Sequence, residues 1–210
     1  MTKIQEIVQL ANGPYGTNCY LLSTKGGVSI IDAPYPASHI IEQIEKMGEL
    51  KNIYLTHGHF DHVLALPELK AKYPACKIYL NEKDNHYFIN EGQDMLEQVA
   101  SFDPFFASRY ASNITKLPSV DYFYSNLDVT EEGFTILELP GHTDGSIGLY
   151  SKALNLIFSG DTLFKQGVGR TDLGGNEKML LQSLSKLKSL PPATVVYPGH
   201  GEKTSIGEEL

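Results

Sequence analysis

The sequence predicts an α/β fold in which two similar lobes bring their sheets together and keep their helices on the outside. Three observations favour this fold. Short apolar runs typical of strands alternate along the chain with amphipathic segments typical of helices. A strand–strand–helix order occurs in each half, without a residue-level repeat. The length of 210 residues suits a single domain, which we take to span residues 1–210.

The first half is expected to form a hairpin, two helices and two further strands. In order, these are a hairpin of strands 19–22 and 28–31, a helix over 37–47, a strand over 53–55, a helix over 63–72 and a strand over 77–80. Gly26 and Gly27 supply the hairpin turn. The spacing of Ile40 and Ile44 places both on one face of the first helix, and Gly48 marks its end.

The second half repeats the strand theme after a long aromatic segment. We expect strands over 134–139, 147–150 and 156–159, a helix over 176–188 and a final strand over 194–197. Residues 82–125 are rich in aromatic side chains. The sequence predicts a helix and a loop there, and the segment is long enough for a second helix. We favour packing against the sheet as the role of these aromatics, because aromatic residues dominate protein cores. The alternative is a lid or pocket wall beside an active site.

Composition narrows the class of protein. Seventeen Lys and Arg against 25 Asp and Glu give a net charge of −8, which argues against sequence-independent nucleic-acid binding. No apolar run approaches the roughly 20 residues of a membrane helix, and the first residues lack a signal-peptide core. We therefore expect a cytoplasmic protein without a membrane partner. Cys19 and Cys76 are far apart and are expected to be free buried thiols.

The strongest functional signal is the segment Thr56-His57-Gly58-His59-Phe60-Asp61-His62. With seven His and ten Asp in the whole chain, this motif is improbable by chance. Alternate side chains of an extended stretch share one face, so His57 and His59 can bind the same metal ion. Asp61 and His62 come at the turn into the next helix and can face a second ion. Imidazole and carboxylate ligands without thiolate suit Zn²⁺, Fe or Mn²⁺.

Three further residues of ligand type each follow an expected strand and a glycine, which permits close approach of the backbone. They are His142, Asp161 and His200. With the four residues of the motif they make a set of seven, enough for two metal ions. Taken alone, His142 would be read as a packed histidine and Asp161 as a turn residue. His39 and His86 lie outside the pattern and are expected on helix surfaces.

These motifs resemble those of the metallo-β-lactamase superfamily. The matching segments are Asp32, His57-x-His59-x-Asp61-His62, Gly141-His142-Thr143, Gly160-Asp161-Thr162 and Pro198-Gly199-His200-Gly201. The resemblance runs from about residue 15 to 207 and implies a four-layer αββα sandwich with a dinuclear metal site at one edge. It also implies the roles of the ligands: His57, His59 and His142 for the first metal, Asp61, His62 and His200 for the second, Asp161 as the bridge and Asp32 as an orienting residue behind them.

Within the superfamily, the segments 160–164 and 169–173 are similar to those of short bacterial members of the glyoxalase II group. Cysteine-ligand β-lactamases have Cys where Asp161 stands, so a β-lactamase activity is not expected. Full-length glyoxalase II has a C-terminal helical domain that binds glutathione. The sequence ends at Leu210, ten residues past His200, so we expect that domain to be missing.

The expected activity is that of a dinuclear metal hydrolase acting on small acyl thioesters, such as hydroxyacyl thioesters. Two divalent ions, with Zn²⁺ first and Fe or Mn as alternatives, lower the pKa of a bridging water. Asp61 and Asp161 are the expected catalytic residues, which orient this nucleophile and handle its proton. Arg170 is a candidate to attract an anionic substrate, unless it forms a buried ion pair with Asp172. A small-molecule thioester is the expected partner.

Two other functions stay open on the sequence. Some relatives with a Gly-Arg-Thr-Asp stretch are mononuclear iron persulfide dioxygenases, which would use His57, His59 and Asp161 as a two-histidine, one-carboxylate site open to O₂. A metal-binding domain without turnover is the non-enzyme alternative. Metal analysis separates the first alternative from the hydrolase, and a broad substrate panel separates the second.

Overall fold

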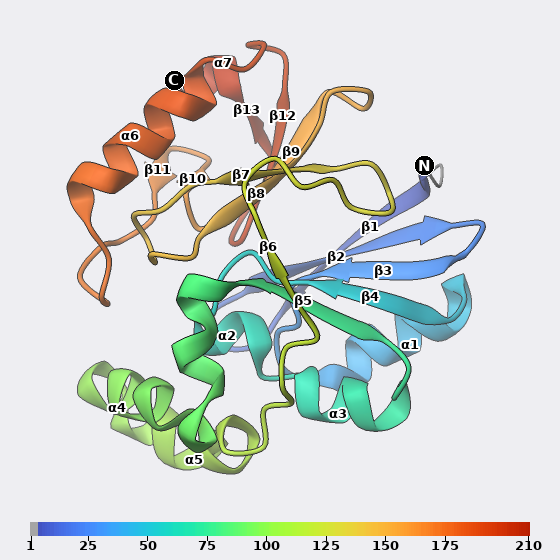
Figure 1. Ribbon diagram of the computed structural model, residues 1–210, viewed down its shortest axis with the longest axis vertical. Helices are drawn as coiled ribbons and strands as arrows, with labels where there is room; N and C mark the ends of the chain where they lie inside the picture. Colours follow the sequence, from blue (N-terminus) through green and yellow to red (C-terminus); the bar gives the residue numbers. More distant parts are fainter. Residues whose placement is uncertain (1–3) are drawn as a thin grey trace.

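Two β-sheets lie face to face with helices on both outer sides, as Figure 1 shows for the computed structural model, which describes residues 4–210. The six-stranded sheet has the order β1-β2-β3-β4-β5-β6, and the five-stranded sheet has the order β13-β12-β9-β8-β7. Helices α1 to α5 cover the first sheet, whereas α6 and α7 cover the second. The expected αββα sandwich is therefore confirmed.

The elements follow the chain without long structureless connections. In the first half they are β1 (Ile4–Asn12), β2 (Thr17–Thr24), β3 (Gly27–Ile31), α1 (Ala37–Met47), β4 (Leu50–Tyr54), α2 (Phe60–Val63), α3 (Leu66–Lys72), β5 (Lys77–Asn81), the 3₁₀ helices η1 (Glu82–Phe88) and η2 (Asn90–Gly92), α4 (Gln93–Phe102) and α5 (Pro104–Ile114). In the second half they are β6 (Tyr122–Tyr124), β7 (Thr135–Glu138), β8 (Ile147–Ser151), β9 (Leu156–Gly160), β10 (Leu163–Phe164), β11 (Gly167–Val168), α6 (Glu177–Lys188), β12 (Val195–Pro198), β13 (Thr204–Ser205) and α7 (Ile206–Glu209).

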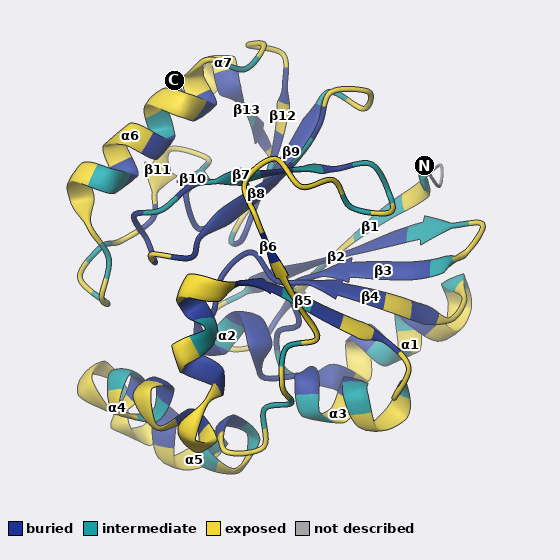
Figure 2. Cartoon of the chain, viewed as in Figure 1, coloured by how far each residue is buried: buried dark blue, intermediate teal, exposed yellow. Residues whose placement is uncertain are grey.

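A structure of four layers has three hydrophobic cores, one between each pair of adjacent layers. The alternation of side chains along the strands supplies apolar residues to the cores on both faces of a sheet. In β2, Cys19 and Leu21 face the helices below the first sheet, whereas Tyr20 and Leu22 face the second sheet. A strand buried on both faces reads as a continuous apolar run, because successive side chains point to opposite sides. The third core lies between the second sheet and α6, where Leu187 is buried. Figure 2 shows buried residues throughout the facing strands and exposed residues along the outer helices.

The strand directions bring the candidate ligands to one edge of the sandwich. In the first sheet, β3, β4 and β5 run parallel. In the second sheet, β7 and β9 are both antiparallel to β8, and β12 is parallel to β9. The carboxyl ends of parallel strands meet at the same edge, where ligand sites of α/β sheets form. At this edge the chain continues past β3, β4, β5, β7, β9 and β12. The residues that follow these six strands are, in the same order, Asp32, His57, Asp84, His142, Asp161 and His200.

Some elements differ from the expectation. Strand β1 is not predicted from the sequence, because its apolar residues alternate irregularly. It pairs with β2 over its length, with a register shift near Glu6. The helix expected over 63–72 begins only at Leu66, as α3, and a separate short helix, α2, precedes it. The backbone of Ala65 donates to Ala33, which diverts the chain, and a proline in the first turn of α3 favours a new helix start there.

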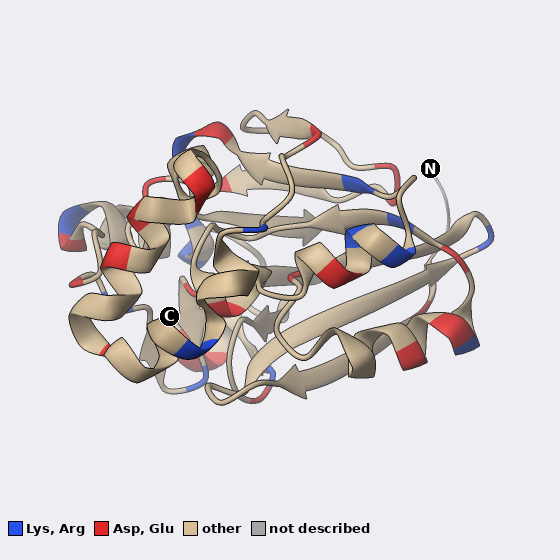
Figure 3. Cartoon of the chain, turned by 90° about the horizontal axis from the view of Figure 1, so that it is seen from below, with Lys and Arg blue, Asp and Glu red and all other residues tan. Residues whose placement is uncertain are grey.

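The surface agrees with the acidic composition. In the view of Figure 3, Lys and Arg are interspersed with Asp and Glu along the helices and loops. Cys19 and Cys76 are both buried free thiols, as expected. Among residues 4–210, no helix is long and apolar enough to cross a membrane.

Candidate metal centre

The His-x-His-x-Asp-His segment changes conformation in the way its spacing predicts. His59 has extended dihedrals and immediately precedes α2, so His57 and His59 lie in the extended stretch after β4. Asp61 and His62 lie in the first turn of α2 and point elsewhere. The backbone N–H of His62 donates to the carbonyl of His59, 3.0 Å away, which closes this turn.

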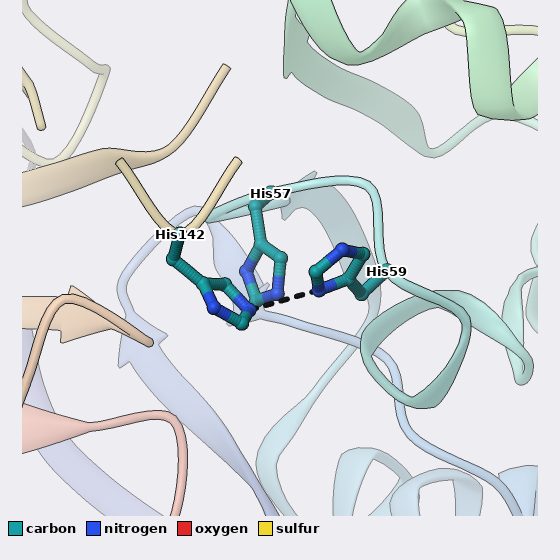
Figure 4. Close-up of side chains that lie close together, drawn as sticks. All are labelled: His57, His59 and His142. Carbon is teal, nitrogen blue, oxygen red and sulfur yellow. Dashed lines mark hydrogen bonds between the residues drawn. The ribbon is translucent and has the colours of Figure 1, made fainter. Parts of the chain in front are cut away.

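The first group of ligands consists of His57, His59 and His142, which point toward one another in Figure 4. One nitrogen of each ring lies within 4.8 Å of the others. His59 Nδ1 and His142 Nε2 are 2.8 Å apart, while His57 Nε2 has no hydrogen-bond partner among the described residues. Two imidazole nitrogens this close must share a proton or a cation, because two bare lone pairs repel each other.

The second group consists of Asp61, His62 and His200. Asp61 Oδ2 lies 3.3 Å from His200 Nε2 and 3.6 Å from His62 Nε2. Asp161 lies between the two groups. Its Oδ2 is 3.3 Å from His200 Nε2 and 3.6 Å from His142 Nε2, and its Oδ1 is 3.4 Å from His62 Nε2. The structure therefore brings all seven predicted ligands together, with Asp161 in the position of a bridge.

Hydrogen bonds on the far side of the rings determine which nitrogens face the centre. Asp32, which is 2% exposed, accepts from His62 Nδ1 at 2.8 Å and from the hydroxyl of Thr56 at 2.8 Å. His57 Nδ1 lies 3.0 Å from that same hydroxyl, so Asp32 orients two histidines, one directly and one through Thr56. With Nδ1 protonated in this way, Nε2 is left free for a metal ion.

Backbone carbonyls orient two further histidines. His142 Nδ1 lies 2.7 Å from the carbonyl of Arg170, and His200 Nδ1 lies 3.1 Å from the carbonyl of Tyr15. The side chain of Arg170 instead pairs with Asp172 through two contacts of 2.5 and 2.6 Å. This pair is exposed, not buried as anticipated, because both side chains project from the loop before α6.

The charges of the two groups differ in the metal-free state. Burial lowers the pKa of His57 well below 6.5, and burial together with His142 lowers the pKa of His59 to about 3. Burial also opposes a charge on His62 and His200, but nearby carboxylates outweigh it. Asp61 and other carboxylates raise the pKa of His62 well above 6.5, and hydrogen bonds to Asp161 and Asp61 raise that of His200 to about 10. His57 and His59 are therefore neutral, whereas the second group is an ion-pair network.

The backbone approaches the ligands closely at Gly199, as the sequence predicts. A Cβ atom at Gly199 would lie 2.0 Å from Asp161 Oδ1 and 2.9 Å from His62. Any side chain there would occupy the space of the ligands themselves. The glycine before His200 is therefore required by packing against the centre.

Two buried polar residues of the centre escaped the sequence analysis. Thr17 donates its hydroxyl to Asp61 Oδ2 at 2.6 Å. Asp84, fully buried in η1, accepts hydrogen bonds from the loops that carry His57, His59 and His142. Asp84 follows β5 just as His57 follows β4, and this shared position was the signal available in the sequence. His39 and His86, by contrast, are exposed on helices, as expected.

The segment 82–125 both packs and forms a wall beside the centre. Met95, Val99 and Ile114 are buried in the core below the first sheet. Two hydrogen bonds tie this segment to loops near the centre: Tyr15 donates to Asp103, between α4 and α5, at 2.7 Å, and Gln98 of α4 donates to the carbonyl of Leu173 at 2.7 Å. The centre is most open where the side chain of His200 is 27% exposed, compared with 0% for His62.

Comparison with known proteins agrees with this geometry. The sequence profile of the metallo-beta-lactamase superfamily matches residues 12–200. The chain belongs to this superfamily. Hydroxyacylglutathione hydrolase GloC of Haemophilus influenzae is 34% identical over 205 residues, which cover 91% of this chain and 89% of the relative.

Two solved structures are also similar over nearly their whole length. BLEG-1, named a B3 metallo-beta-lactamase, is 30% identical with a TM-score of 0.83 and covers 97% of this chain and 95% of its own. TTHA1623, solved in a di-iron-bound form, is 32% identical with a TM-score of 0.79 and covers 96% of each chain. The glyoxalase II-like resemblance is therefore confirmed at the level of family, and the family is one of metal-dependent hydrolases.

Proposed function

We propose that this protein is a dinuclear metal hydrolase that cleaves small acyl thioesters to a carboxylate and a thiol. The observation that carries the proposal is the convergence of seven imidazole and carboxylate groups, all but Asp61 and His200 buried, in two groups joined by Asp161. The similarity to a hydroxyacylglutathione hydrolase supports a thioester as the substrate class.

The residues fit two divalent cations. His57, His59 and His142 would hold the first ion, Asp61, His62 and His200 the second, and Asp161 both. Four buried atoms of this set make no hydrogen bond within the described part of the chain, and each is a ligand-type atom: His57 Nε2, His59 Nε2, His62 Nε2 and Asp161 Oδ1. Buried polar atoms are normally paired, so a run of unpaired ones in one place indicates a missing partner. Zn²⁺ suits this ligand set, as do Fe and Mn²⁺.

Bound there, two divalent cations would act as Lewis acids that make water a nucleophile near neutral pH and polarise a thioester carbonyl. The chain contributes charge, orientation and proton handling. Asp161 offers one negative charge to both groups, and the carboxylates of Asp61 and Asp161 are the proton acceptors of the centre. The hydroxyl of Thr17 fixes one oxygen of Asp61. The aromatic ring of Phe164 lies 6.0 Å from the ring of His200, between centroids, and offers apolar contact to an acyl or thiol group.

The test combines metal analysis with a thiol-release assay. We expect about two transition-metal ions per chain in protein reconstituted with Zn²⁺ or Fe²⁺. The loaded protein should release thiol from lactoylglutathione and from shorter thioesters, with weak selectivity for the glutathione portion. Trace metal after reconstitution, or no release from any thioester, would refute the proposal.

Two further substrates belong in the same panel because specific observations favour them. A β-lactam is included because the similar BLEG-1 is named a β-lactamase, although Asp161 occupies the position of the cysteine ligand found in some β-lactamases. A persulfide with O₂ electrode detection is included because of the Gly169-Arg170-Thr171-Asp172 stretch. One Fe per chain with O₂ uptake and no thiol release would assign the dioxygenase function instead.

A further inference from the structure

Asp84 is a buried carboxylate outside the seven ligands. It is fully buried in η1, directly beyond the end of β5. Its Oδ2 accepts from the backbone N–H of Gly58 at 2.8 Å and from the hydroxyl of Thr143 at 2.7 Å, and its Oδ1 accepts from the backbone N–H of Gly145 at 2.7 Å. All three donors are neutral, and an anion in this position is costly to bury.

The three donors belong to two loops that are far apart in the sequence. Gly58 lies between His57 and His59, and Thr143 follows His142 directly. One carboxylate thus joins the loops that supply the whole first group of ligands. None of its three donors lies in helix α2, which carries Asp61 and His62, or in the loop that carries His200.

Both glycines among the donors are packed against the carboxylate. A Cβ atom at Gly145 would lie 2.5 Å from Asp84 Oδ1 and Cγ, and one at Gly58 would lie 3.1 Å from Asp84 Cβ and 2.5 Å from Tyr87. The loops can therefore approach the carboxylate only because these residues lack side chains. The pattern Thr143-x-Gly145 after a ligand histidine is explained by this contact.

We infer that Asp84 is a positioning residue for the first metal site, holding the His57–His59 loop and the His142 loop at the separation that one metal ion requires. The inference rests on the metal centre proposed above, but not on the thioester substrate. Groups that hold metal ligands in place typically contribute 10- to 100-fold to metal affinity. The negative charge of Asp84 also lies against the two loops that carry these histidines, where it favours a cation.

The test is the substitution Asp84→Asn, which keeps the shape but removes the charge and turns one acceptor into a donor facing a donor. Asp121→Asn is the matched control. Like Asp84, Asp121 accepts a backbone N–H, here that of Ile78 at 3.0 Å, but it lies at the opposite end of β5, just before β6. Zn²⁺ affinity is measured by competition with a chromophoric chelator, on protein shown to be folded by circular dichroism. Imidazole ¹⁵N NMR reports which histidines bind Zn²⁺.

We expect folded Asp84→Asn protein to bind the first ion roughly 10- to 100-fold more weakly. The resonances of His57, His59 and His142 should respond only at correspondingly higher Zn²⁺ concentration, while those of His62 and His200 respond as in the unmutated protein. If Asp84→Asn does not fold, Thr143→Val, which removes one of the three donors, should show a smaller loss with the same pattern.

Wild-type affinity in the folded variant, or an equal loss in Asp121→Asn, would overturn the inference. A uniform loss at both groups would also overturn it, because a merely structural role would weaken both sites. Failure of the unmutated protein to bind Zn²⁺ would refute the metal centre itself, and the inference with it. Normal Zn²⁺ binding without thioester hydrolysis would refute only the proposed substrate.

Discussion

Replacing Asp32 by Asn should weaken the metal centre without disturbing the fold. Asp32 has a φ of 60°, in the left-handed region where Asn is well tolerated, so the backbone has no reason to change. The substitution also conserves volume at a site that is 2% exposed. Its effect is therefore chemical: one carboxylate oxygen becomes an amide donor, and the negative charge is lost.

The direction of the effect follows from the hydrogen bonds. Asp32 Oδ1 accepts from the backbone N–H of Thr56 at 2.8 Å, and Oδ2 accepts from His62 Nδ1 and from the Thr56 hydroxyl. If the amide nitrogen replaces Oδ2, it favours the His62 tautomer with a proton on Nε2, which is the atom needed by the metal. If it replaces Oδ1, it faces the N–H of Thr56. The first arrangement therefore favours the tautomer that a metal ion cannot use, and the second leaves two donors opposed.

The magnitude follows from the loss of such an orienting group, which costs 10- to 100-fold in metal affinity, or about 1.4 to 2.7 kcal/mol. Chelator competition should show this loss for the second ion, and a smaller one for the first, because His57 depends on Asp32 only through Thr56. Circular dichroism should stay unchanged. Wild-type affinity for both ions in Asp32→Asn would refute the orienting role.

Three further predictions follow from the charges of the centre. Asp161→Asn should lose most turnover and part of its metal, because a neutral amide cannot balance two dications, yet keep its circular dichroism spectrum; full metal content and turnover would place the bridge elsewhere. Metal binding at pH 7 should release about two protons, because the raised pKa values of His62 and His200 keep both residues protonated until a metal ion binds. Calorimetry in buffers of different ionisation enthalpy counts these protons. Release of none would contradict the ion-pair network. In protein treated with a chelator, the stability contributed by the raised pKa of His200 is fully present below about pH 6.5 and is lost as pH rises through about 10. Denaturant unfolding at several pH values measures this loss. The free energy of unfolding of His200→Ala should decline less over the same pH range.

Local patterns were enough to predict most elements and to single out the seven candidate ligands that the fold brings together. Alternation in β2 and the spacing of Ile40 and Ile44 in α1 depend on neighbouring residues, so the sequence carries them directly. The same holds for the His-x-His-x-Asp-His segment, whose switch from extended chain to helix separates two pairs of ligands. Strand β1 escaped prediction because its pattern is irregular and its order comes from pairing with β2.

By itself, the sequence determined which residue types are available for metal chemistry and on which strand ends they lie. The tertiary structure alone decided how they act together. Asp161 lies between the two groups of candidate ligands, and Asp84 links the loops that carry the first group, only when β5, β7 and β9 end at one edge. Arg170, a candidate for substrate binding by its charge, contacts the centre through its backbone carbonyl. These relations join residues separated by tens of positions, and no local pattern encodes the distance between two atoms that only folding brings together.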